Sequence, residues 1–284
     1  MNNQQAFELI QKIVYEQSGM RLAESKLYLV ETRLASYCRE EKCANIGELM
    51  TKIGMPTPAI TKRIVESMTT NETWWFRDGD LYDAFTKVLF PELVKRKLLA
   101  NQHEILLWSA ACSTGQEVYS LKMVWEKFKP QAKGVKLKII ATDIDTQVLE
   151  RAKAGKYSQL EVGRGLPTMD LMMNFEQAGT EWSVGAHLKA DIEWKQASLM
   201  GMPPMLGTVD IALCRNVLIY FDDDGKRQIL GNIRRALRPD GLLFIGGSES
   251  IFALNTDYRR INVAKVFAYG SEEAEKAAVN LKTQ

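Results

Sequence analysis

The sequence predicts an α/β protein whose main domain contains a doubly wound, mostly parallel sheet, preceded by an all-α N-terminal domain. Two patterns lead to this prediction. After Glu104, short apolar runs alternate with segments of helical periodicity, which is typical of βαβ units. Residues 1–70 show helical periodicity alone. The 284 residues, 46% of them hydrophobic and 25% charged, suffice for one large domain and one small one.

The N-terminal domain is expected to be a set of short amphipathic helices. The first has an apolar stripe and ends near residues 18–19, where a glycine follows a serine. The second begins at Ser25, which we expect to act as its N-cap. A third short helix begins at Asn45, and helical spacing returns over 60–68 after two prolines. An aromatic cluster at 74–76 then precedes a predicted helix, around 81–99, that contains a proline.

The α/β region supplies the strands and helices of the sheet. The predicted strands are 105–109, 137–142, 209–214, 242–246 and 265–269, and the predicted helices are 116–128, 146–153 and 225–237. Residues 180–198 depart from this alternation. Period-two patterning around Trp182 and Trp194 predicts a small antiparallel excursion there. The tail after Ser271 is polar and is expected to be a loose helix or disordered.

The first strand, the turn after it and the second strand suggest a nucleoside pocket. A buried strand, 105–108, runs into a turn of small residues, 109–115, and the next strand ends on Asp143. Small residues let the backbone approach a ligand, and a carboxylate at the next strand end can accept both ribose hydroxyls. The turn contains one glycine, Gly115, and no G-x-G-x-x-G, so a diphosphate is disfavoured and S-adenosylmethionine (SAM) is favoured. An ordinary βαβ unit with an incidental Asp143 is the alternative.

Composition excludes several classes of protein. A net charge of +2 argues against a nucleic-acid-binding protein. The four cysteines lack C-x-x-C spacing and the chain has two histidines, so neither a metal site nor a disulfide framework is expected. The N-terminus has no apolar signal region, and no apolar run approaches the length of a membrane span. We therefore expect a cytoplasmic protein with no membrane insertion.

Four segments, taken in order, resemble one family. They are Asn71–Arg77 (NETWWFR), Trp108–Glu117 (WSAACSTGQE), Ala141–Asp145 (ATDID) and Leu213–Phe221 (LCRNVLIYF). The set closely resembles the CheR family, the chemotaxis-receptor glutamate O-methyltransferases, and Leu237–Glu249 is similar to that family's closing strand. The resemblance covers essentially the whole chain.

The resemblance implies a domain plan. It implies an all-α domain over 1–70 that recognises the receptor, and a linker over 71–90 that begins the cofactor pocket. A Rossmann-like SAM-dependent methyltransferase domain with an antiparallel last strand would follow over 91–270, with a small β-subdomain at about 179–197 and a tail over 271–284.

The resemblance also implies site residues. Cofactor contacts would fall on Asn71, Thr73, Arg77, Glu117, Asp143, Ser198, Leu199, Arg215 and Asn216. Tyr220 matches the family tyrosine near the transferred methyl group, and Arg77 is expected to hold the cofactor's methionine carboxylate. Lys26 and Arg33, seven residues apart on the second helix, would dock on an acidic receptor helix. Several assignments have a structural alternative. These are core packing for Tyr220, a favourable helix-dipole position for Glu117, a structural role for Arg215 and Asn216, and a solvated face for the two basic residues. Trp74 and Trp75 are expected to pack at the domain junction, with adenine stacking as the alternative.

Three departures from the family pattern bear on these assignments. The turn glycine is followed by Gln116–Val118 where relatives have Glu-Glu-Pro, although Glu117 is retained. Ser198 stands where asparagine is frequent, and serine reaches less far. The loop at 179–184 is shorter than in members that bind a receptor's C-terminal pentapeptide, so we expect this chain to act without that tether.

The chemistry agrees with the residues present. A receptor glutamate is already ionised at neutral pH, so methyl transfer to it needs no strong base, and no Ser-His-Asp or Cys-His arrangement is found. The predicted partners are therefore chemoreceptor cytoplasmic domains, and nucleic acid is not expected. One alternative is a regulatory protein that uses the same fold to bind SAM or a nucleotide. A small-molecule or RNA methyltransferase is less favoured, because the sequence has no basic groove and no Asn-Pro-Pro-Tyr motif.

Overall fold

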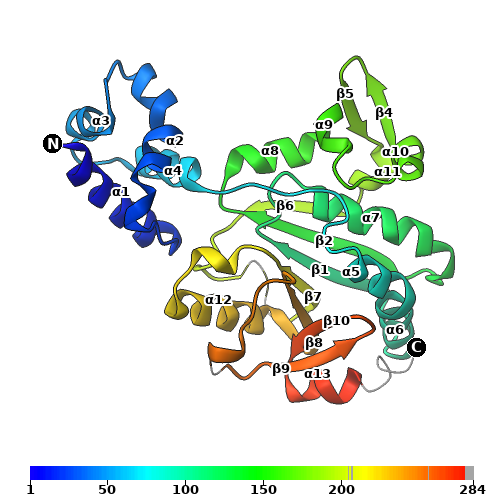
Figure 1. Ribbon diagram of the computed structural model, residues 1–284. Helices are drawn as coiled ribbons and strands as arrows, with labels where there is room; N and C mark the ends of the chain where they lie inside the picture. The colour runs from blue at the N-terminus through cyan, green and yellow to red at the C-terminus, as the bar shows by residue number, and fades with distance from the viewer. Residues whose placement is uncertain (204, 206, 255, 279–284) are drawn as a thin grey trace. The chain divides into compact units, whose positions relative to one another are not determined.

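The computed structural model describes residues 1–203, 205, 207–254 and 256–278 (Figure 1). The chain divides into two compact units. Unit 1 comprises Met1–Thr70 and Ile219–Gln228, and unit 2 comprises Asn71–Leu218 and Ile229–Gln284. No pattern in the sequence indicates that 219–228 would join the first unit.

Residues 1–70 of unit 1 form four α-helices and a short 3₁₀ turn. The helices are α1 (Asn3–Ser18), α2 (Leu27–Glu40), α3 (Ile46–Ile53) and α4 (Pro58–Met68). Both α1 and α2 pack on α3 and α4, and their apolar faces are buried. The third helix begins after Asn45, close to the predicted start, and Asn45 caps it because its carboxamide oxygen accepts a backbone N–H that the helix leaves free. The prediction for Ser25 is wrong: it lies inside the 3₁₀ turn, and α2 begins at Leu27 without a side-chain cap.

Unit 2 contains a seven-stranded sheet in the order β6-β2-β1-β7-β8-β10-β9. The strands are β1 (Glu104–Ala110), β2 (Lys136–Asp143), β6 (Ile192–Gln196), β7 (Val209–Cys214), β8 (Leu237–Ile245), β9 (Arg259–Val263) and β10 (Val266–Gly270). The five strands from β6 to β8 run parallel, whereas β10 pairs in the antiparallel sense with β8 and β9. The predicted mostly parallel, doubly wound sheet with an antiparallel last strand is therefore confirmed.

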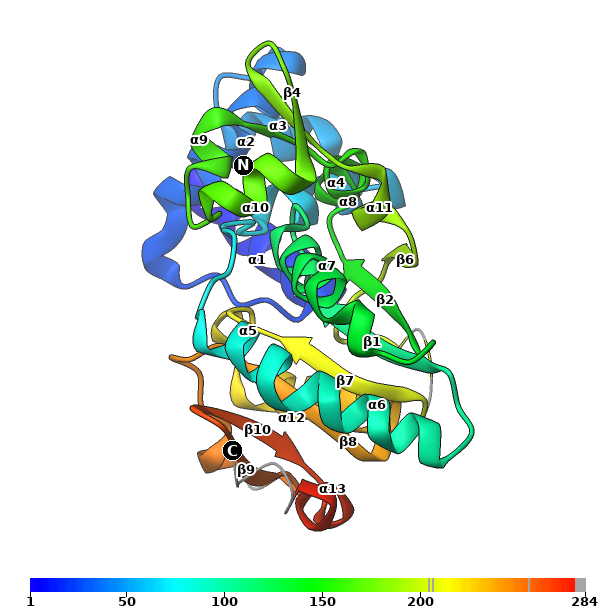
Figure 2. The same cartoon turned by 90° about the vertical axis from the view of Figure 1, so that its right-hand side faces the viewer.

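Helices cover both faces of this sheet. They are α5 (Asp80–Ala84), α6 (Phe90–Leu99), α7 (Gln116–Phe128), α8 (Thr146–Ala154), α12 (Asp223–Ala236) and α13 (Glu272–Ala277). Figure 2 shows α5, α6 and α7 in front of the sheet and the end of α12 behind it. The tail predicted after Ser271 begins with α13, and residues 279–284 lie outside the described part of the chain.

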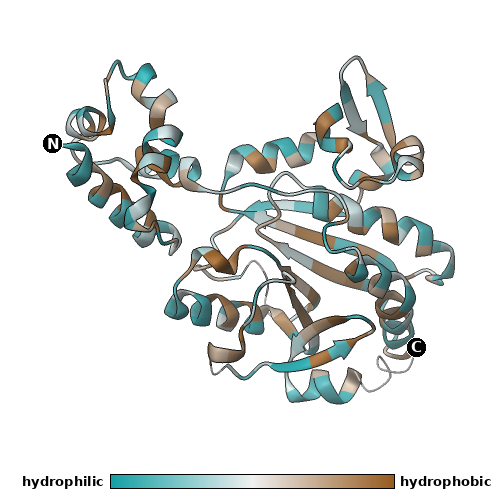
Figure 3. Ribbon diagram, in the orientation of Figure 1, coloured by the Kyte–Doolittle hydropathy of each residue, from teal (hydrophilic) through white to brown (hydrophobic). Residues whose placement is uncertain are grey.

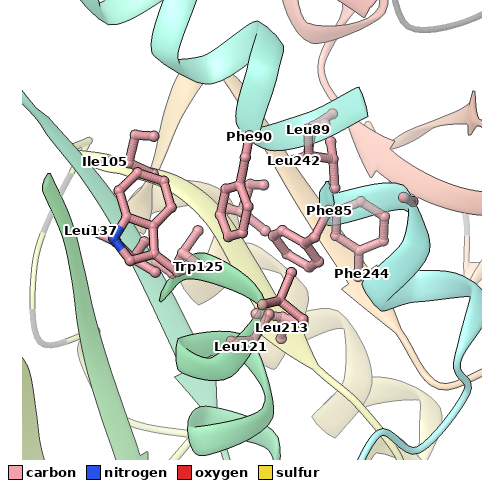
Figure 4. Close-up of a cluster of buried hydrophobic side chains, with 14 of the residues drawn as sticks. Phe85, Leu89, Phe90, Ile105, Leu121, Trp125, Leu137, Leu213, Leu242 and Phe244 are labelled. Atoms are coloured by element: carbon pink, nitrogen blue, oxygen red, sulfur yellow. The ribbon is translucent and has the colours of Figure 1, made fainter. Parts of the chain in front are cut away.

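The core lies between α5–α7 and the sheet. Phe85, Phe90 and Trp125 pack on strand residues such as Leu137 and Leu213 (Figure 4). Strand β7 is buried along its whole length, and Figure 3 shows brown, hydrophobic residues concentrated in the central strands. Burial on both faces is typical of a central parallel strand, and it explains why these segments read as continuous apolar runs.

The proline in the predicted helix 81–99 is accommodated by a change of helix type. A π-helical turn, Phe85–Leu89, joins α5 to α6, and the N–H of Phe90 donates to the carbonyl of Phe85. Pro91 then falls in the first turn of α6. A proline lacks the N–H and crowds the preceding turn of an ordinary α-helix, so a widened turn before it lets the chain stay helical.

A small second sheet belongs to unit 2, in the order β3-β5-β4. Its antiparallel strands are β3 (Lys156–Ser158), β4 (Phe175–Ala178) and β5 (Glu181–Val184), with the short helices α9 (Gln159–Val162), α10 (Thr168–Asn174) and α11 (Ala186–Lys189) beside them. The antiparallel subdomain predicted at about 179–197 is thus misplaced at both ends, because β3 and β4 precede residue 179 and β6 pairs in parallel with β2 in the main sheet. Ile192 and Trp194 pack on the core while Glu193 and Lys195 pair with each other. Period-two patterning reports one buried face and says nothing about strand direction.

Two features are absent from the described part of the chain. No helix there has the length and apolar character needed to cross a membrane. No group of three or more His, Cys, Asp or Glu side chains among the described residues is placed to hold a metal ion.

Candidate functional site

The predicted cofactor residues of unit 2 gather at one edge of the main sheet. Strands β1, β2 and β7 are parallel neighbours, so their carboxyl ends meet at this edge. The turn 111–115 follows β1, Asp143 ends β2, and Arg215 follows β7. Segments that are far apart in sequence are therefore brought within hydrogen-bonding distance of each other.

The turn after β1 has a constrained backbone. Ala111, Ser113 and Gly115 all have positive φ, at 63°, 51° and 91°. Non-glycine residues rarely adopt this conformation, and such residues cluster at functional sites. At position 115 only glycine fits, since an added Cβ would lie 2.9 Å from the Cβ of Ala152. The constrained turn directs the N–H of Ser113 at Asp143.

Asp143 is a buried carboxylate at the end of β2, with 6% of its surface exposed. Its Oδ2 accepts from the N–H of Ser113 at 2.8 Å, and its Oδ1 accepts from the N–H of Asp145 at 3.0 Å. Burial raises the pKa of Asp143 to about 6, although these backbone donors favour the ionised form. A carboxylate offers roughly four lone-pair sites; Ser113, Asp145 and a third backbone donor, Ile144, use some of them, and the remainder is available for a ligand's hydroxyl groups.

Asn71 ties the 71–77 segment to this corner of the sheet. Its Nδ2 donates to Oδ2 of Asp145 at 2.8 Å, and its carbonyl accepts from the Ser113 hydroxyl at 2.8 Å. Thr73 lines a groove of about 560 Å³ together with Asn71, Thr114 and Gln116. Glu117, Asp143 and Arg215 do not line that groove, so it lies beside the predicted cofactor site and includes only part of it.

The two tryptophans of the 71–77 segment have different surroundings. Trp75 is fully buried and meets Tyr157 and Phe175 edge-on, at ring-centroid distances of 4.9 and 5.3 Å. It is a core residue of unit 2. Trp74 is half-buried, and the guanidinium of Arg77 lies 4.0 Å from its ring centroid. This cation–π contact restricts Arg77 while leaving its N–H donors available for a carboxylate.

Arg215 and Glu117, both predicted to contact the cofactor, bind each other. Nη1 of Arg215 lies 2.7 Å from Oε2 of Glu117, and Oε1 of Glu117 accepts from the Ser109 hydroxyl at 2.7 Å. Nη2 of Arg215 donates to Asp78 and to the Arg77 carbonyl, each at 2.7 Å. Burial disfavours the charged form, but Glu117 and Asp78 raise the pKa of Arg215 above its ordinary value. The guanidinium therefore stays charged and holds the 77–78 backbone beside the sheet.

Asp78 and Glu249 belong to the site but were not predicted from the sequence. Asp78 has a positive φ of 60° and follows the family-like motif by one residue, where no spacing rule marks it. Glu249 holds the loop after β7: its Oε2 accepts from the N–H groups of Asn216 and Gly246 at 2.7 Å, and its Oε1 accepts from Leu218 at 2.8 Å. The signal for Glu249 was present, because it closes the segment that resembles the family's last motif.

Ser198 and Leu199 lie in the segment after β6, which starts beside Asp143. The N–H of Ala197 donates to the Asp143 carbonyl at 2.9 Å. Ser198 accepts a hydrogen bond from the N–H of Met200 at 3.2 Å, and the Leu199 carbonyl accepts from Asn232 at 2.8 Å. Ala197 thus ties the start of this segment to the end of β2, and Leu199 is held by Asn232 of α12.

The remaining predicted residues, Tyr220, Lys26 and Arg33, belong to unit 1. Arg33 donates to the carbonyls of Met68 and Thr69 and to the hydroxyl of Thr70, so it caps the end of α4. Partial burial lowers the pKa of Arg33, and nearby Tyr220 opposes this effect. Lys26 is exposed and immediately precedes α2. The two basic residues predicted to share a docking face therefore differ: Lys26 is exposed, whereas the guanidinium of Arg33 is engaged within the unit.

Comparison with known families and proteins gives one consistent result. Residues 71–267 match the family described as CheR methyltransferase, SAM binding domain, and residues 5–69 match the one described as CheR methyltransferase, all-alpha domain. The chain is 35% identical over 267 residues to chemotaxis protein methyltransferase 1 of Pseudomonas aeruginosa, covering 93% of this chain and 96% of that protein. It is 33% identical over 268 residues to chemotaxis protein methyltransferase Cher2 of Pseudomonas putida, with 93% and 96% coverage.

Proposed function

This chain belongs to the CheR methyltransferase family, and we propose that it transfers the methyl group of SAM to glutamate side chains of chemoreceptor cytoplasmic helices. The observation that carries the proposal is the buried Asp143 carboxylate, presented at the end of β2 beside a turn of small residues. The products would be glutamate methyl esters and S-adenosylhomocysteine. The proposed place of action is the cytoplasm, where these receptor helices lie.

The residues at the sheet edge fit this cofactor. The lone pairs left on Asp143 suit the two ribose hydroxyls, and the turn's single glycine suits a nucleoside without phosphates. Ser198 and Leu199 would contact the adenine side, and Asn71, Thr73 and Asn216 the remainder of the cofactor. Glu117 and Arg215 would act as an ion pair that presents one ordered polar surface to the cofactor.

Arg77 would hold the cofactor's methionine carboxylate. Its guanidinium is oriented by Trp74, and a planar guanidinium can bind a carboxylate through two parallel hydrogen bonds. The same group is unsuited to clamp the substrate carboxylate, because stabilising that charge in the ground state would slow transfer.

The site supports methyl transfer to an oxygen that is already ionised. Both histidines of the chain lie elsewhere: His103 precedes β1, and His187 bonds to Asn174 beside the small sheet. When bound, SAM supplies an electrophilic methyl group on a sulfonium. Both charges diminish toward the transition state, so alignment of the groups and exclusion of water would provide most of the acceleration. Tyr220 would orient the incoming glutamate through its hydroxyl.

We further propose that the protein acts without a pentapeptide tether and without nucleic acid. Only two residues, 179–180, separate β4 from β5, which supports the first point. The balanced charge of the chain supports the second. Lys26, as an exposed cation, remains the candidate for docking on an acidic receptor helix.

The decisive experiment uses methyl-labelled SAM and purified receptor cytoplasmic fragments. We expect base-labile methyl ester on a fragment that contains the glutamates, and none on a fragment with those glutamates replaced by alanine. If the protein binds SAM but labels no receptor fragment, the proposed substrate is wrong.

A further inference from the structure

Segment 219–222, which carries Tyr220, is hydrogen-bonded to residues 20–21, which follow helix α1 in unit 1. The N–H of Arg21 donates to the carbonyl of Tyr220 at 2.9 Å, and Met20 forms an isolated antiparallel bridge with Phe221. Met20 and Phe221 are both buried, with 9% and 8% of their surfaces exposed. The backbone around the proposed catalytic tyrosine is therefore defined by a segment from the opposite end of the chain.

The segment that receives 219–222 is itself well held. Helix α1 ends at Gly19, which has the left-handed conformation that glycine tolerates (φ 74°). Gln11 then donates to the carbonyl of Leu22 at 2.7 Å, so residues 20–22 run back along α1. Residues 20–22 are therefore held at both ends, by the C-cap Gly19 and by the hydrogen bond to Leu22. This ordered backbone is the one with which Tyr220 and Phe221 pair.

Asp222 completes the attachment. Its Oδ2 accepts from the Tyr15 hydroxyl at 3.2 Å and lies 3.7 Å from Nε of Arg21, while its Oδ1 accepts from the N–H of Gly225 at 2.8 Å in the first turn of α12. The hydrogen bond from Gly225, aided by Tyr15 and Arg21, lowers the pKa of Asp222. One carboxylate therefore caps α12 and joins it to α1, two residues after Tyr220.

We propose that Asp222 and Tyr15 are positioning residues, which hold the 219–222 segment so that Tyr220 is correctly placed for methyl transfer. The proposal rests on the role proposed above for Tyr220. It assigns the positioning of the Tyr220 side chain to contacts within unit 1. Because the hydrogen bond between Tyr15 and Asp222 lies within unit 1, whereas Asp143 and its turn belong to unit 2, loss of this bond should slow turnover and leave SAM binding intact.

The test compares Tyr15→Phe, Asp222→Asn and the double variant with Asp224→Asn as the matched control. The carboxamide introduced by Asp222→Asn would still cap α12 but would lack the charge that Tyr15 and Arg21 face. The control removes a carboxylate only two positions away that is 91% exposed at its side chain. Tyr15 is half exposed, so its phenylalanine variant should keep the packing of α1. Thermal unfolding and circular dichroism establish that each variant is folded at the assay temperature.

We expect Tyr15→Phe and Asp222→Asn each to lower kcat roughly 3- to 10-fold, in keeping with loss or weakening of one solvent-exposed hydrogen bond. The SAM dissociation constant, measured by calorimetry, and the KM for the receptor fragment should not change. The kcat loss in the double variant should be smaller than the product of the two single losses, since both changes act on the same contact. Asp224→Asn should retain wild-type kinetics.

Two results would overturn the proposal, and each is distinct from failure of the proposed function. Wild-type kcat in both folded variants would show that the attachment does not matter to the reaction. Wild-type kcat in Tyr220→Phe, with receptor methylation intact, would show that there is no tyrosine to position. Absence of methylation by the wild-type protein would refute the proposed substrate, and the positioning proposal would fall with it.

Discussion

Arg215 and Glu117 are 98 residues apart in the sequence, yet they form an ion pair at 2.7 Å in which the Arg215 side chain is only 3% exposed. The sequence predicts each of them as a separate cofactor contact. Their mutual pairing means that neither presents an uncompensated charge. Through its bonds to the Arg77 carbonyl and the Asp78 carboxylate, Arg215 also holds residues 77–78 beside the carboxyl edge of the sheet.

Arg215→Met should destabilise unit 2 strongly. Removing one member of a buried pair leaves the other charge uncompensated, at a cost of about 3–5 kcal/mol. The double variant Arg215→Met/Glu117→Gln should recover part of this loss, because the orphaned charge is removed as well. Urea unfolding of the two single variants and the double variant measures the coupling. Additive losses would show that the two side chains do not stabilise each other.

Asp143→Ala should abolish most of the SAM affinity. A buried hydroxyl pair on the cofactor would lose its acceptor, at a cost on the order of 2–4 kcal/mol. Calorimetric titration with SAM measures the effect. Asp191→Asn is the matched control, because this exposed residue immediately before β6 has a positive φ of 59° that asparagine tolerates. Unchanged affinity in Asp143→Ala would refute the ribose assignment.

SAM affinity should depend on pH through Asp143. Burial raises its pKa to about 6, and the ionised carboxylate is the better acceptor for hydroxyl groups. Affinity should therefore be constant well above that pKa and fall by up to about tenfold per pH unit below it. Titrations across this range with the wild type and with Asp143→Asn provide the check. The same decline in the asparagine variant would assign the dependence to another group.

The free energy of unfolding should also depend on pH through Asp143, but it should decrease as the pH rises. Because the pKa of Asp143 is higher in the folded protein than its ordinary value of 3.8, the folded state binds the proton more tightly. This contribution to stability is complete below the unfolded-state pKa and is lost as pH rises through about 6. The shift corresponds to about 3 kcal/mol, and Asp143→Asn should remove this part of the pH profile. Urea unfolding of both proteins at a series of pH values measures the difference.

Lys26→Glu and Arg33→Glu should have different effects, although the sequence pairs them. Lys26 is exposed, so its reversal should raise the KM for the receptor fragment, more at low salt than at high salt, with no change in thermal stability. Arg33→Glu should also lower the melting temperature, because Arg33 binds the carbonyls that end α4. Equal, salt-independent KM values in Lys26→Glu and wild type would exclude this docking face.

Several features of the fold and the site could be read directly from the sequence. Alternating apolar runs and helical periodicity located β1, β2, β7 and the helices α7, α8 and α12 to within one or two residues. The sequence alone also predicted that the turn after β1 and Asp143 are neighbours, because the carboxyl ends of adjacent parallel strands must meet at one edge. Sequence periodicity is therefore sufficient to locate a site that is formed by residues at the ends of neighbouring parallel strands.

The tertiary structure alone determined which distant side chains meet. It placed β6 in the main sheet, paired Arg215 with Glu117, and attached the Tyr220 segment to α1 through Tyr15 and Asp222. Side-chain periodicity reports which face of an element is buried, but it does not report which partner covers that face. Charge pairing and backbone bridging between distant segments result from packing of the whole chain, so no local pattern in the sequence encodes them.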